Sequence, residues 1–229
     1  MRYEIIGGSM PVAICYLDNG ESIVTESGAM SWMSPNMQME TSSGGGVGKM
    51  VGRMFSGEHL FLNRYTAIGG PGEIAFASSF VGSIIPFVVT PQQSIICQKS
   101  AYLAGQPSVE LSAHVIQRPG AGFVGGEGFV MQKLTGNGLV FVEIDGYVVE
   151  RNLEPGQQLV VSTGMVAAME TTVQMTVQRI KGAKNMLFGG EGLFNTYLTG
   201  PGKVYLQTMP KQELAASIRP YISSSKVGK

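Results

Sequence analysis

The segment Gly20-Glu21-Ser22-Ile23-Val24 occurs in three versions in this 229-residue chain. The other two versions are Gln92-Gln93-Ser94-Ile95-Ile96 and Gly156-Gln157-Gln158-Leu159-Val160. They begin at residues 20, 92 and 156, so the spacing is 72 residues and then 64. A period of this length indicates one supersecondary unit that is used three times. We therefore expect an array of three related units.

A turn motif with two glycines recurs with nearly the same period. Its three copies are Gly70-Pro71-Gly72, Gly136-Asn137-Gly138 and Gly200-Pro201-Gly202. A strand-like apolar run follows each copy, at residues 73–76, 139–142 and 203–206. Glycine and proline mark turns, so each copy predicts a turn that leads into a strand.

Alternating segments indicate the fold class. Apolar or small residues occupy the first, third and fifth positions of three aligned segments, residues 37–41, 109–113 and 173–177. This period of two is typical of a strand with one face on a core. Many short strands at regular spacing, with glycine and proline turns, indicate a sandwich or barrel. The sequence predicts an all-β protein.

The repeats set the expected domain boundaries. We predict repeat one at 1–68, repeat two at 69–134 and repeat three at 135–198. The tail, 199–229, begins like a fourth repeat, and we expect its strand to close the array against repeat one, which would remove an open sheet edge. Residues 212–218 predict a short helix, and residues 223–229 predict a frayed end.

Composition excludes some classes of partner. Only 14% of the residues are charged, against roughly 25% in an average protein. The 16 basic and 16 acidic residues give zero net charge, so no basic face favours nucleic acid. The low charge favours a surface that is partly covered, most simply by other copies of the chain. A homo-oligomer is therefore expected.

The chain also lacks the sequence signals of export and of membrane insertion. Residues 1–4 begin a strand rather than a signal peptide, and no apolar run approaches the roughly 18 residues of a membrane span. We expect a cytoplasmic protein. Cys15 and Cys97 show no disulfide or metal spacing, so both are expected to be buried as small hydrophobic residues.

Repeat one carries a glycine-rich insertion at residues 42–57. It differs from a phosphate-binding loop, because Ser43 replaces the first glycine and Met50 replaces the hydroxyl residue that binds magnesium. The alternative is a loop that leads into a short turn with an apolar stripe beside two cations. These residues are Lys49, Met50, Arg53, Met54 and Phe55. We favour packing on the body or on another subunit over contact with a membrane surface.

A Gly-Glu pair recurs at one aligned place in each repeat and puts Glu58, Glu127 and Glu191 at related positions. If the three carboxylates met near a pseudo-threefold axis, they could bind a cation or raise each other's pKa. The alternative is that each carboxylate accepts hydrogen bonds from backbone amides of its own turn. We favour the second interpretation, since each repeat must solve the same folding problem.

Trp32 is the only tryptophan and aligns with Ala104 and Ala168. Met30 and Met33 lie beside it, and such a soft apolar region suits a protein contact, although we favour core packing. The two histidines, His59 and His114, show no metal-ligand or triad arrangement. No catalytic residue, metal site or cofactor is therefore predicted.

Several motifs together carry a resemblance to a known family. They are residues 44–48, 57–65, Gly70-Pro71-Gly72, Gly126-Glu127-Gly128 and Gly190-Glu191-Gly192. Over about residues 1–210 the chain resembles the altered-inheritance-of-mitochondria family of biogenesis proteins and its bacterial members. The resemblance implies a fold similar to the tryptophan RNA-binding attenuator protein (TRAP-like), with three β-sandwich units of the double-stranded β-helix class in a pseudo-threefold arrangement. It implies no catalytic residue.

Our leading hypothesis is a non-catalytic, oligomeric scaffold or interaction protein that acts through an unknown protein partner, with peripheral membrane contact as a variant. The first alternative is a small-ligand-binding module, by analogy of fold, which does not by itself transfer function. The second is a metal-dependent enzyme of cupin type. Such sites usually need several histidine ligands, and this chain has two histidines.

Overall fold

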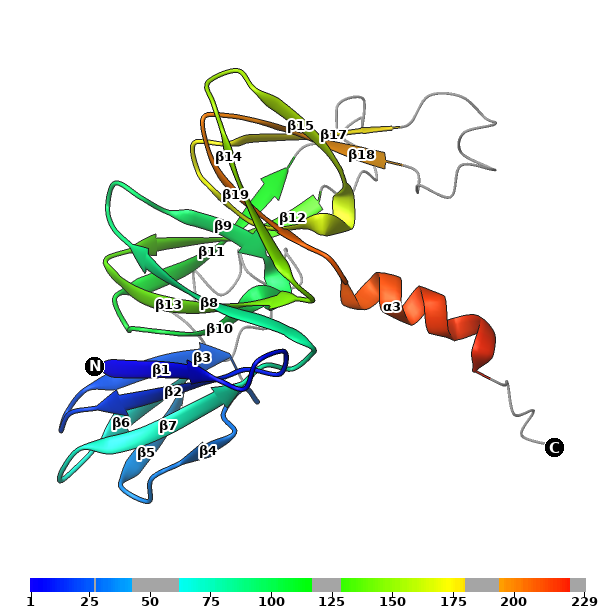
Figure 1. Ribbon diagram of the computed structural model, residues 1–229. Coiled ribbons are helices and arrows are strands. Elements are labelled where there is room, and N and C mark those ends of the chain that lie inside the picture. The colour runs from blue at the N-terminus through cyan, green and yellow to red at the C-terminus, as the bar shows by residue number, and fades with distance from the viewer. Residues whose placement is uncertain (27, 43–61, 117–128, 180–193, 223–229) are drawn as a thin grey trace.

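The computed structural model describes residues 1–26, 28–42, 62–116, 129–179 and 194–222. Within these residues the chain forms 19 strands in four antiparallel sheets and one α-helix near the C-terminus (Figure 1). The predicted all-β class is confirmed, and so is a short helix in the predicted place. No helix in the described residues is long and apolar enough to cross a membrane.

The sheets contain four, six, six and three strands. The first has the order β1 (Arg2–Ile6), β2 (Val12–Leu17), β7 (Gly72–Ala77) and β4 (Trp32–Met33). The second has the order β5 (Met37–Ser42), β6 (Leu62–Ala67), β3 (Ser22–Glu26), β10 (Tyr102–Gly105), β13 (Gly138–Asp145) and β8 (Gly82–Val89).

The third sheet has the order β11 (Val109–Ile116), β12 (Phe129–Gly136), β9 (Ile95–Gln98), β16 (Val166–Glu170), β19 (Gly202–Gln207) and β14 (Val148–Leu153). The fourth has the order β15 (Gln158–Ser162), β18 (Phe194–Thr199) and β17 (Gln174–Arg179). Short 3-10 turns, η1 (Lys99–Ala101) and η2 (Thr163–Met165), precede β10 and β16. Helix α3 (Lys211–Ile218) and the turn η3 (Arg219–Tyr221) follow β19.

The strands fall into three sets, β1–β7, β8–β13 and β14–β19, which we call the first, second and third sets. Each set contains two groups of three neighbouring strands, which we call trios. The middle strand of the first trio is β6, β12 or β18, and the middle strand of the second is β7, β13 or β19. The sets follow one another in a row from blue to orange in Figure 1. The strands expected after the glycine turns are the middle strands of the second trios. A pseudo-threefold axis stays a prediction.

Direct strand pairing joins consecutive sets. β3 of the first set pairs with β10 of the second, and β9 of the second pairs with β16 of the third. The small residues Ala104 and Ala168 lie in these joints and are fully buried. The Tyr102 hydroxyl also crosses the first joint and donates to the carbonyl of Val24 at 2.8 Å. Two of the four sheets are thereby continuous from one set into the next.

The apolar core is divided in the same way. One cluster of buried residues lies mainly in the first set and includes Ile74 and Phe76. Another includes Leu134 and Val140 of the second set. A third cluster, around Leu198, lies mainly in the third set. Each set therefore encloses apolar side chains between its own two trios, as expected for sandwich units.

Two expectations about boundaries are wrong. β7 lies inside predicted repeat two, yet it pairs with β2 and β4 of the first set. β19 was expected to close the array against repeat one, but it pairs with β14 and β16. The strand after each glycine turn therefore completes a set instead of opening one, which is why the tail began like a fourth repeat.

Gly136 provides a test of the turn between β12 and β13. Its φ is +114°, a conformation that L side chains rarely adopt, and a Cβ atom there would meet the carbonyl oxygen of Ser108. Gly136→Ala should lower the free energy of unfolding by about 3 kcal/mol, measured by chemical denaturation. Gly156→Ala is the control, because its φ is +77° but nothing lies within 4 Å of the added Cβ; it should cost about 1 kcal/mol. Equal losses would contradict this account.

Candidate functional site

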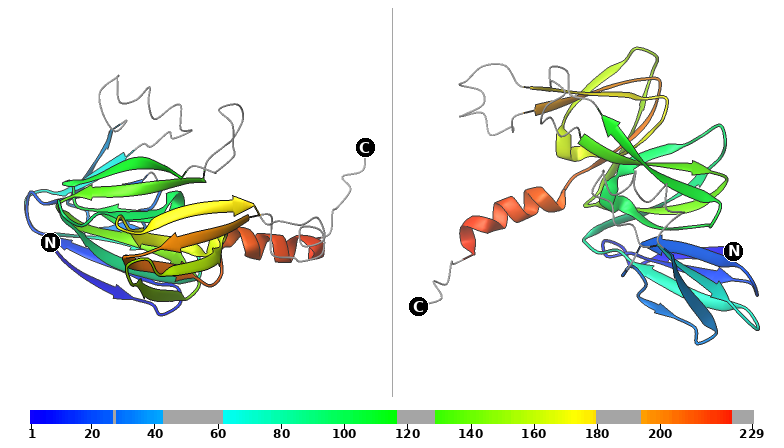
Figure 2. Two further views of the ribbon diagram at one scale, coloured as in Figure 1. Left: turned by 90° about the horizontal axis from the view of Figure 1, so that it is seen from above. Right: turned by 180° about the vertical axis from the view of Figure 1, so that it is seen from behind.

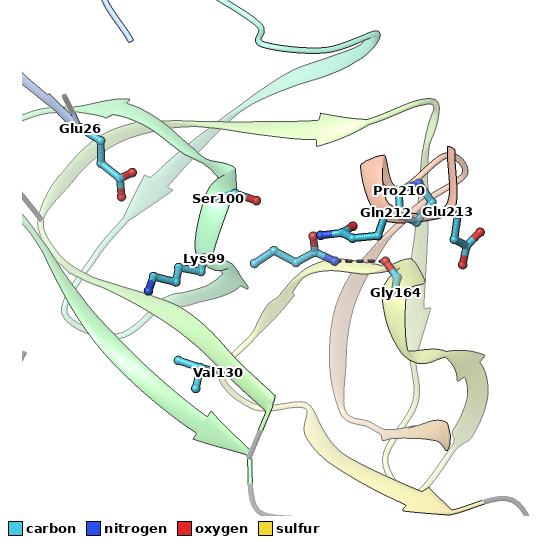
Figure 3. Close-up of a pocket in the computed structure, with 9 residues that line it drawn as sticks. Glu26, Lys99, Ser100, Val130, Gly164, Pro210, Gln212 and Glu213 are labelled. Atoms are coloured by element: carbon cyan, nitrogen blue, oxygen red, sulfur yellow. Dashed lines mark hydrogen bonds between the residues drawn. The ribbon is translucent and has the colours of Figure 1, made fainter. Parts of the chain in front are cut away.

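A cavity of about 560 Å³ lies where the three sets and the start of α3 meet (Figure 3). Its lining comes from β3, β9, η1, β12, η2 and the α3 region: Glu26, Gln98, Lys99, Ser100, Val130, Gly164, Pro210, Gln212 and Glu213. The volume falls in the range of small-molecule sites. The joints between sets therefore create a candidate ligand pocket.

Paired amides build one wall of the pocket. The Gln98 side chain donates to the carbonyls of Gly164 and Val166 at 3.1 and 2.7 Å, and the first of these bonds is drawn in Figure 3. Gln207, which is buried, donates to the same Gly164 carbonyl at 2.8 Å and to the Gln98 side chain at 3.3 Å. This network ties η2 to β9 and β19, so the wall is held in place.

Gln132 lies on β12, two residues from Val130, which lines the pocket. Its side chain is 1% exposed, and its Oε1 atom has no hydrogen-bond partner among the described residues. Its Nε2 atom donates to Glu26 at 3.5 Å, the outer limit of a hydrogen bond. Gln132 is on the same face of β12 as Val130, because side chains two apart share a face. A buried acceptor without a donor is costly to the fold.

Two other buried groups near Glu26 are not set up for nucleophilic chemistry. Burial, and then the Glu26 carboxylate, raise the pKa of Cys97 to about 12. Burial raises the pKa of the Tyr102 phenol as well. Because the thiolate is the reactive form of cysteine, Cys97 is inert at neutral pH. Burial also raises the pKa of Cys15 to about 12, so the same holds for this thiol. The prediction that both cysteines are buried is confirmed.

A polar cluster fixes the base of α3 beside the pocket. The Lys211 ammonium lies 3.2 Å from Glu143 and 3.3 Å from Asp145. Its backbone N–H donates to the second oxygen of Asp145 at 3.0 Å. Ser79 donates to Glu143 from its backbone N–H and its hydroxyl, at 2.8 and 2.6 Å. We call Ser79, Glu143, Asp145 and Lys211 the helix latch, because they attach α3 to β13.

Two opposing effects set the pKa of Glu143. Burial alone would raise it, but the hydrogen bonds from Ser79 and the nearby Lys211 ammonium outweigh burial and lower the pKa below its ordinary value. Glu143 is therefore ionised when the protein is folded at neutral pH, and the latch carries its full charge.

The structure places few of the predicted site residues. Glu58, Glu127, Glu191 and the stripe formed by Lys49, Met50, Arg53, Met54 and Phe55 lie outside the described residues, as does His59. Trp32 and Met33 are 45% and 36% exposed, so the favoured core packing is wrong for them. Met30 is half-buried against the first-set cluster.

His114 is half-buried on β11 and is not one of the residues that line the pocket. Burial, and then the charge of Lys133, lower its pKa. Among the described residues, no group of three His, Cys, Asp or Glu side chains could hold a metal ion.

Gln132 was not predicted from the sequence, although a signal existed. It pairs across from Cys97, while Asn63 pairs with Thr25 and Thr196 pairs with Val161, and the three strand pairs are equivalent. Asn63, Gln132 and Thr196 are all buried. A polar residue at one buried position in each set would have pointed to a special environment.

Replacing Gln132 tests whether its unpaired oxygen is a cost to the fold. Gln132→Met keeps the length of the side chain and removes the acceptor. We expect the free energy of unfolding to stay equal or rise by about 1 kcal/mol, measured by denaturation with urea. Gln207→Met is the control, since its paired amide is lost, and it should destabilise the protein by about 2 kcal/mol. A loss at Gln132 as large as at Gln207 would show that its oxygen is satisfied.

The helix latch should depend on pH. Because the folded pKa of Glu143 is lowered, its stabilising effect is present above about pH 5 and is lost as the pH falls through the folded pKa. Glu143→Gln should cost about 2 kcal/mol at pH 7, and the difference from wild type should vanish in acid. Glu110→Gln, at an exposed position on β11, should give no such trend in thermal unfolding. A constant Glu143→Gln deficit across pH would contradict the latch.

Comparison with known proteins gives the family and the fold. The family described as Mitochondrial biogenesis AIM24 matches residues 3–209. A crystal structure of a Streptococcus pyogenes protein is similar, with a TM-score of 0.77 and 22% identity over 96% of this chain and 99% of that one; at this identity the likeness concerns the fold alone. No curated protein matches. The similarity to the attenuator protein stays a prediction. The match over nearly the whole chain confirms that the protein belongs to the AIM24 family of mitochondrial biogenesis proteins.

Proposed function

We propose that this protein is a non-catalytic, oligomeric scaffold or interaction protein, with the segment α3–η3 as one of its contact elements. One observation carries the proposal. Helix α3 extends from the body and buries none of its residues (Figures 1 and 2). A helix of eight residues is marginal in water on its own. Contact with another protein would stabilise it.

The exposed side chains of this segment support a protein contact. Ile218 is 44% exposed, Tyr221 is 87% exposed and Ile222 is 67% exposed. Apolar and aromatic groups that gather on a surface favour interaction sites. The helix latch holds the base of α3 against β13, so the segment is presented in a fixed direction.

Charge favours a protein partner over a membrane surface. Lys211 and Arg219 are the cations of the segment α3–η3, and Lys211 is engaged by Glu143 and Asp145. Helices that lie on membranes are usually rich in lysine and arginine on their polar face. The zero net charge of the chain likewise gives no support to nucleic acid. Peripheral membrane contact and a cytoplasmic location stay predictions.

The cavity supports a second candidate, a small-ligand-binding module. Its lining combines apolar surface from Val130 and Pro210 with the polar side chains of Glu26 and Lys99. Ligand pockets typically combine an apolar lining with a few such polar groups. A ligand could act together with assembly, since the pocket is built from all three sets.

Native mass spectrometry of the gently purified chain tests both candidates. We expect an oligomer at micromolar concentration. Ile218→Ser, Tyr221→Ser and Ile222→Ser together should weaken association about tenfold, which is about 1.4 kcal/mol. Ala216→Ser, at an exposed position on α3, is the matched control and should change nothing. A strictly monomeric wild-type chain would contradict the scaffold, and a reproducible extra mass on each subunit would favour the ligand module.

A further inference from the structure

The strands β4 and β15 form sheet edges at opposite ends of the molecule, and they are equivalent to the strands that pair in its internal joints. Figure 1 shows β4 at the lower end of the row of sets and β15 at the upper end. Within the described residues, each of these strands has a hydrogen-bonded neighbour on one side only: β7 beside β4, and β18 beside β15. Their outer backbone groups remain available for pairing.

The pairing registers show that β4 is equivalent to β10 and β16. Trp32 pairs with Ala75 on β7, Ala104 with Phe141 on β13, and Ala168 with Tyr205 on β19. β7, β13 and β19 are the middle strands of equivalent trios. β10 and β16 use their second side to pair with the preceding set. β4 has no preceding set to pair with.

β15 is equivalent in the same way to β3 and β9. Thr25, Cys97 and Val161 each pair with the buried polar residue of the neighbouring strand, on β6, β12 and β18. β3 and β9 use their second side to pair with the set that follows. β15 has no following set. One end of the molecule therefore carries β4, the equivalent of β10 and β16, and the other end carries β15, the equivalent of β3 and β9. These are the two kinds of strand that pair in each internal joint.

Side chains on the two edges strengthen the match. Trp32 and Met33 are 45% and 36% exposed, and Val160 is 49% exposed. At the positions of Trp32 and Met33 in the internal joints, Ala104, Ala168 and Met169 are buried, and Ile96 is buried at the position of Val160. Exposed apolar residues at positions that are buried elsewhere in the molecule indicate that these edges are covered by another protein surface.

Most of the other edge strands are protected against such pairing. Charged residues and proline on an edge oppose the addition of another strand. Five of the six remaining outer strands carry one: Arg2 on β1, Glu40 on β5, Pro86 on β8, Glu110 on β11 and Glu150 on β14. β4, with Trp32 and Met33, and β15, with the sequence Gln-Leu-Val-Val-Ser, carry neither.

We propose that β15 of one copy pairs with β4 of a second copy, antiparallel, in the register of the internal joints. This inference rests on the proposed oligomeric function and identifies its surface. The internal joints place Thr25 opposite Ala104, and Cys97 opposite Ala168. The same register places Val161 opposite Trp32 of the next copy, and Val160 opposite Met33. The contact is head-to-tail, so copies form a ring if the rotation closes and a filament if it does not.

Cysteine cross-linking between two different variants tests the register directly. Purified Trp32→Cys and Val161→Cys chains are mixed and oxidised mildly with copper phenanthroline. Directly opposed strand residues lie within the Cα separation that a disulfide needs. We expect a covalent dimer in the mixture. Trp32→Cys mixed with Val88→Cys, on the proline-protected edge β8, should give none. The native Cys15 and Cys97 are buried and should not interfere.

A charged residue on the edge provides the second test. Val160→Lys should weaken self-association at least tenfold by native mass spectrometry, because it places a cation in the joint. Val88→Lys, at a position that is 64% exposed, is the matched control and should leave association within twofold. Circular dichroism checks that both variants are folded; if Val160→Lys does not fold, the cross-link decides alone.

The outcomes separate this inference from the proposed function. A wild-type oligomer without the Trp32–Val161 cross-link would overturn the β4–β15 joint and leave the scaffold intact. A monomeric wild type would overturn both. Association that survives the tail substitutions but is lost in Val160→Lys would support the joint and move the contact from α3 to the strand edges.

Discussion

Backbone pairing between sets is the interaction on which the rest of this structure depends. β3–β10 and β9–β16 turn three small sandwiches into continuous six-stranded sheets. Without those two contacts, four strands would become additional open edges, and edges are sites of unwanted pairing. The cavity also depends on the joints, because its walls come from three sets and the helix base. The pocket is therefore complete only when the three sets are paired.

Residues of two kinds recur at and beside the joints. Ala104 and Ala168 lie where two sets meet and are fully buried. One strand further in, a buried polar residue recurs as Asn63, Gln132 and Thr196. The Asn63 side chain accepts from Thr41 at 2.8 Å, whereas the Gln132 oxygen has no partner in the described residues. The side-chain oxygen at this position therefore has a hydrogen-bond donor in the first set, whereas in the second set it has none among the described residues.

Much of the fold could be predicted from the sequence, because its signals are local. The alternating segments and the turns with two glycines identify strands that the structure contains, including β5, β11, β7, β13 and β19. The phase of the repeat could not be predicted, since periodicity does not say which strand begins a set. The exposure of Trp32 was missed for a related reason: alignment with two buried alanines suggests a core position, unless the end of the array is known. The pocket and the helix latch depend on residues more than 60 positions apart, such as Glu143 and Lys211, and no local pattern reports such contacts.

The second set has a property that the end sets lack. It carries β10, which accepts the preceding set, and β9, which accepts the following one. It is therefore a self-compatible module in the sense of a linear polymer, whereas within one chain the first and third sets each use only one side of a joint. An in-frame duplication of residues 82–145 would lengthen the array without requiring any new contact chemistry. Each further duplication of this module, in nature or in the laboratory, would add one more set to the array through the same two kinds of strand pairing.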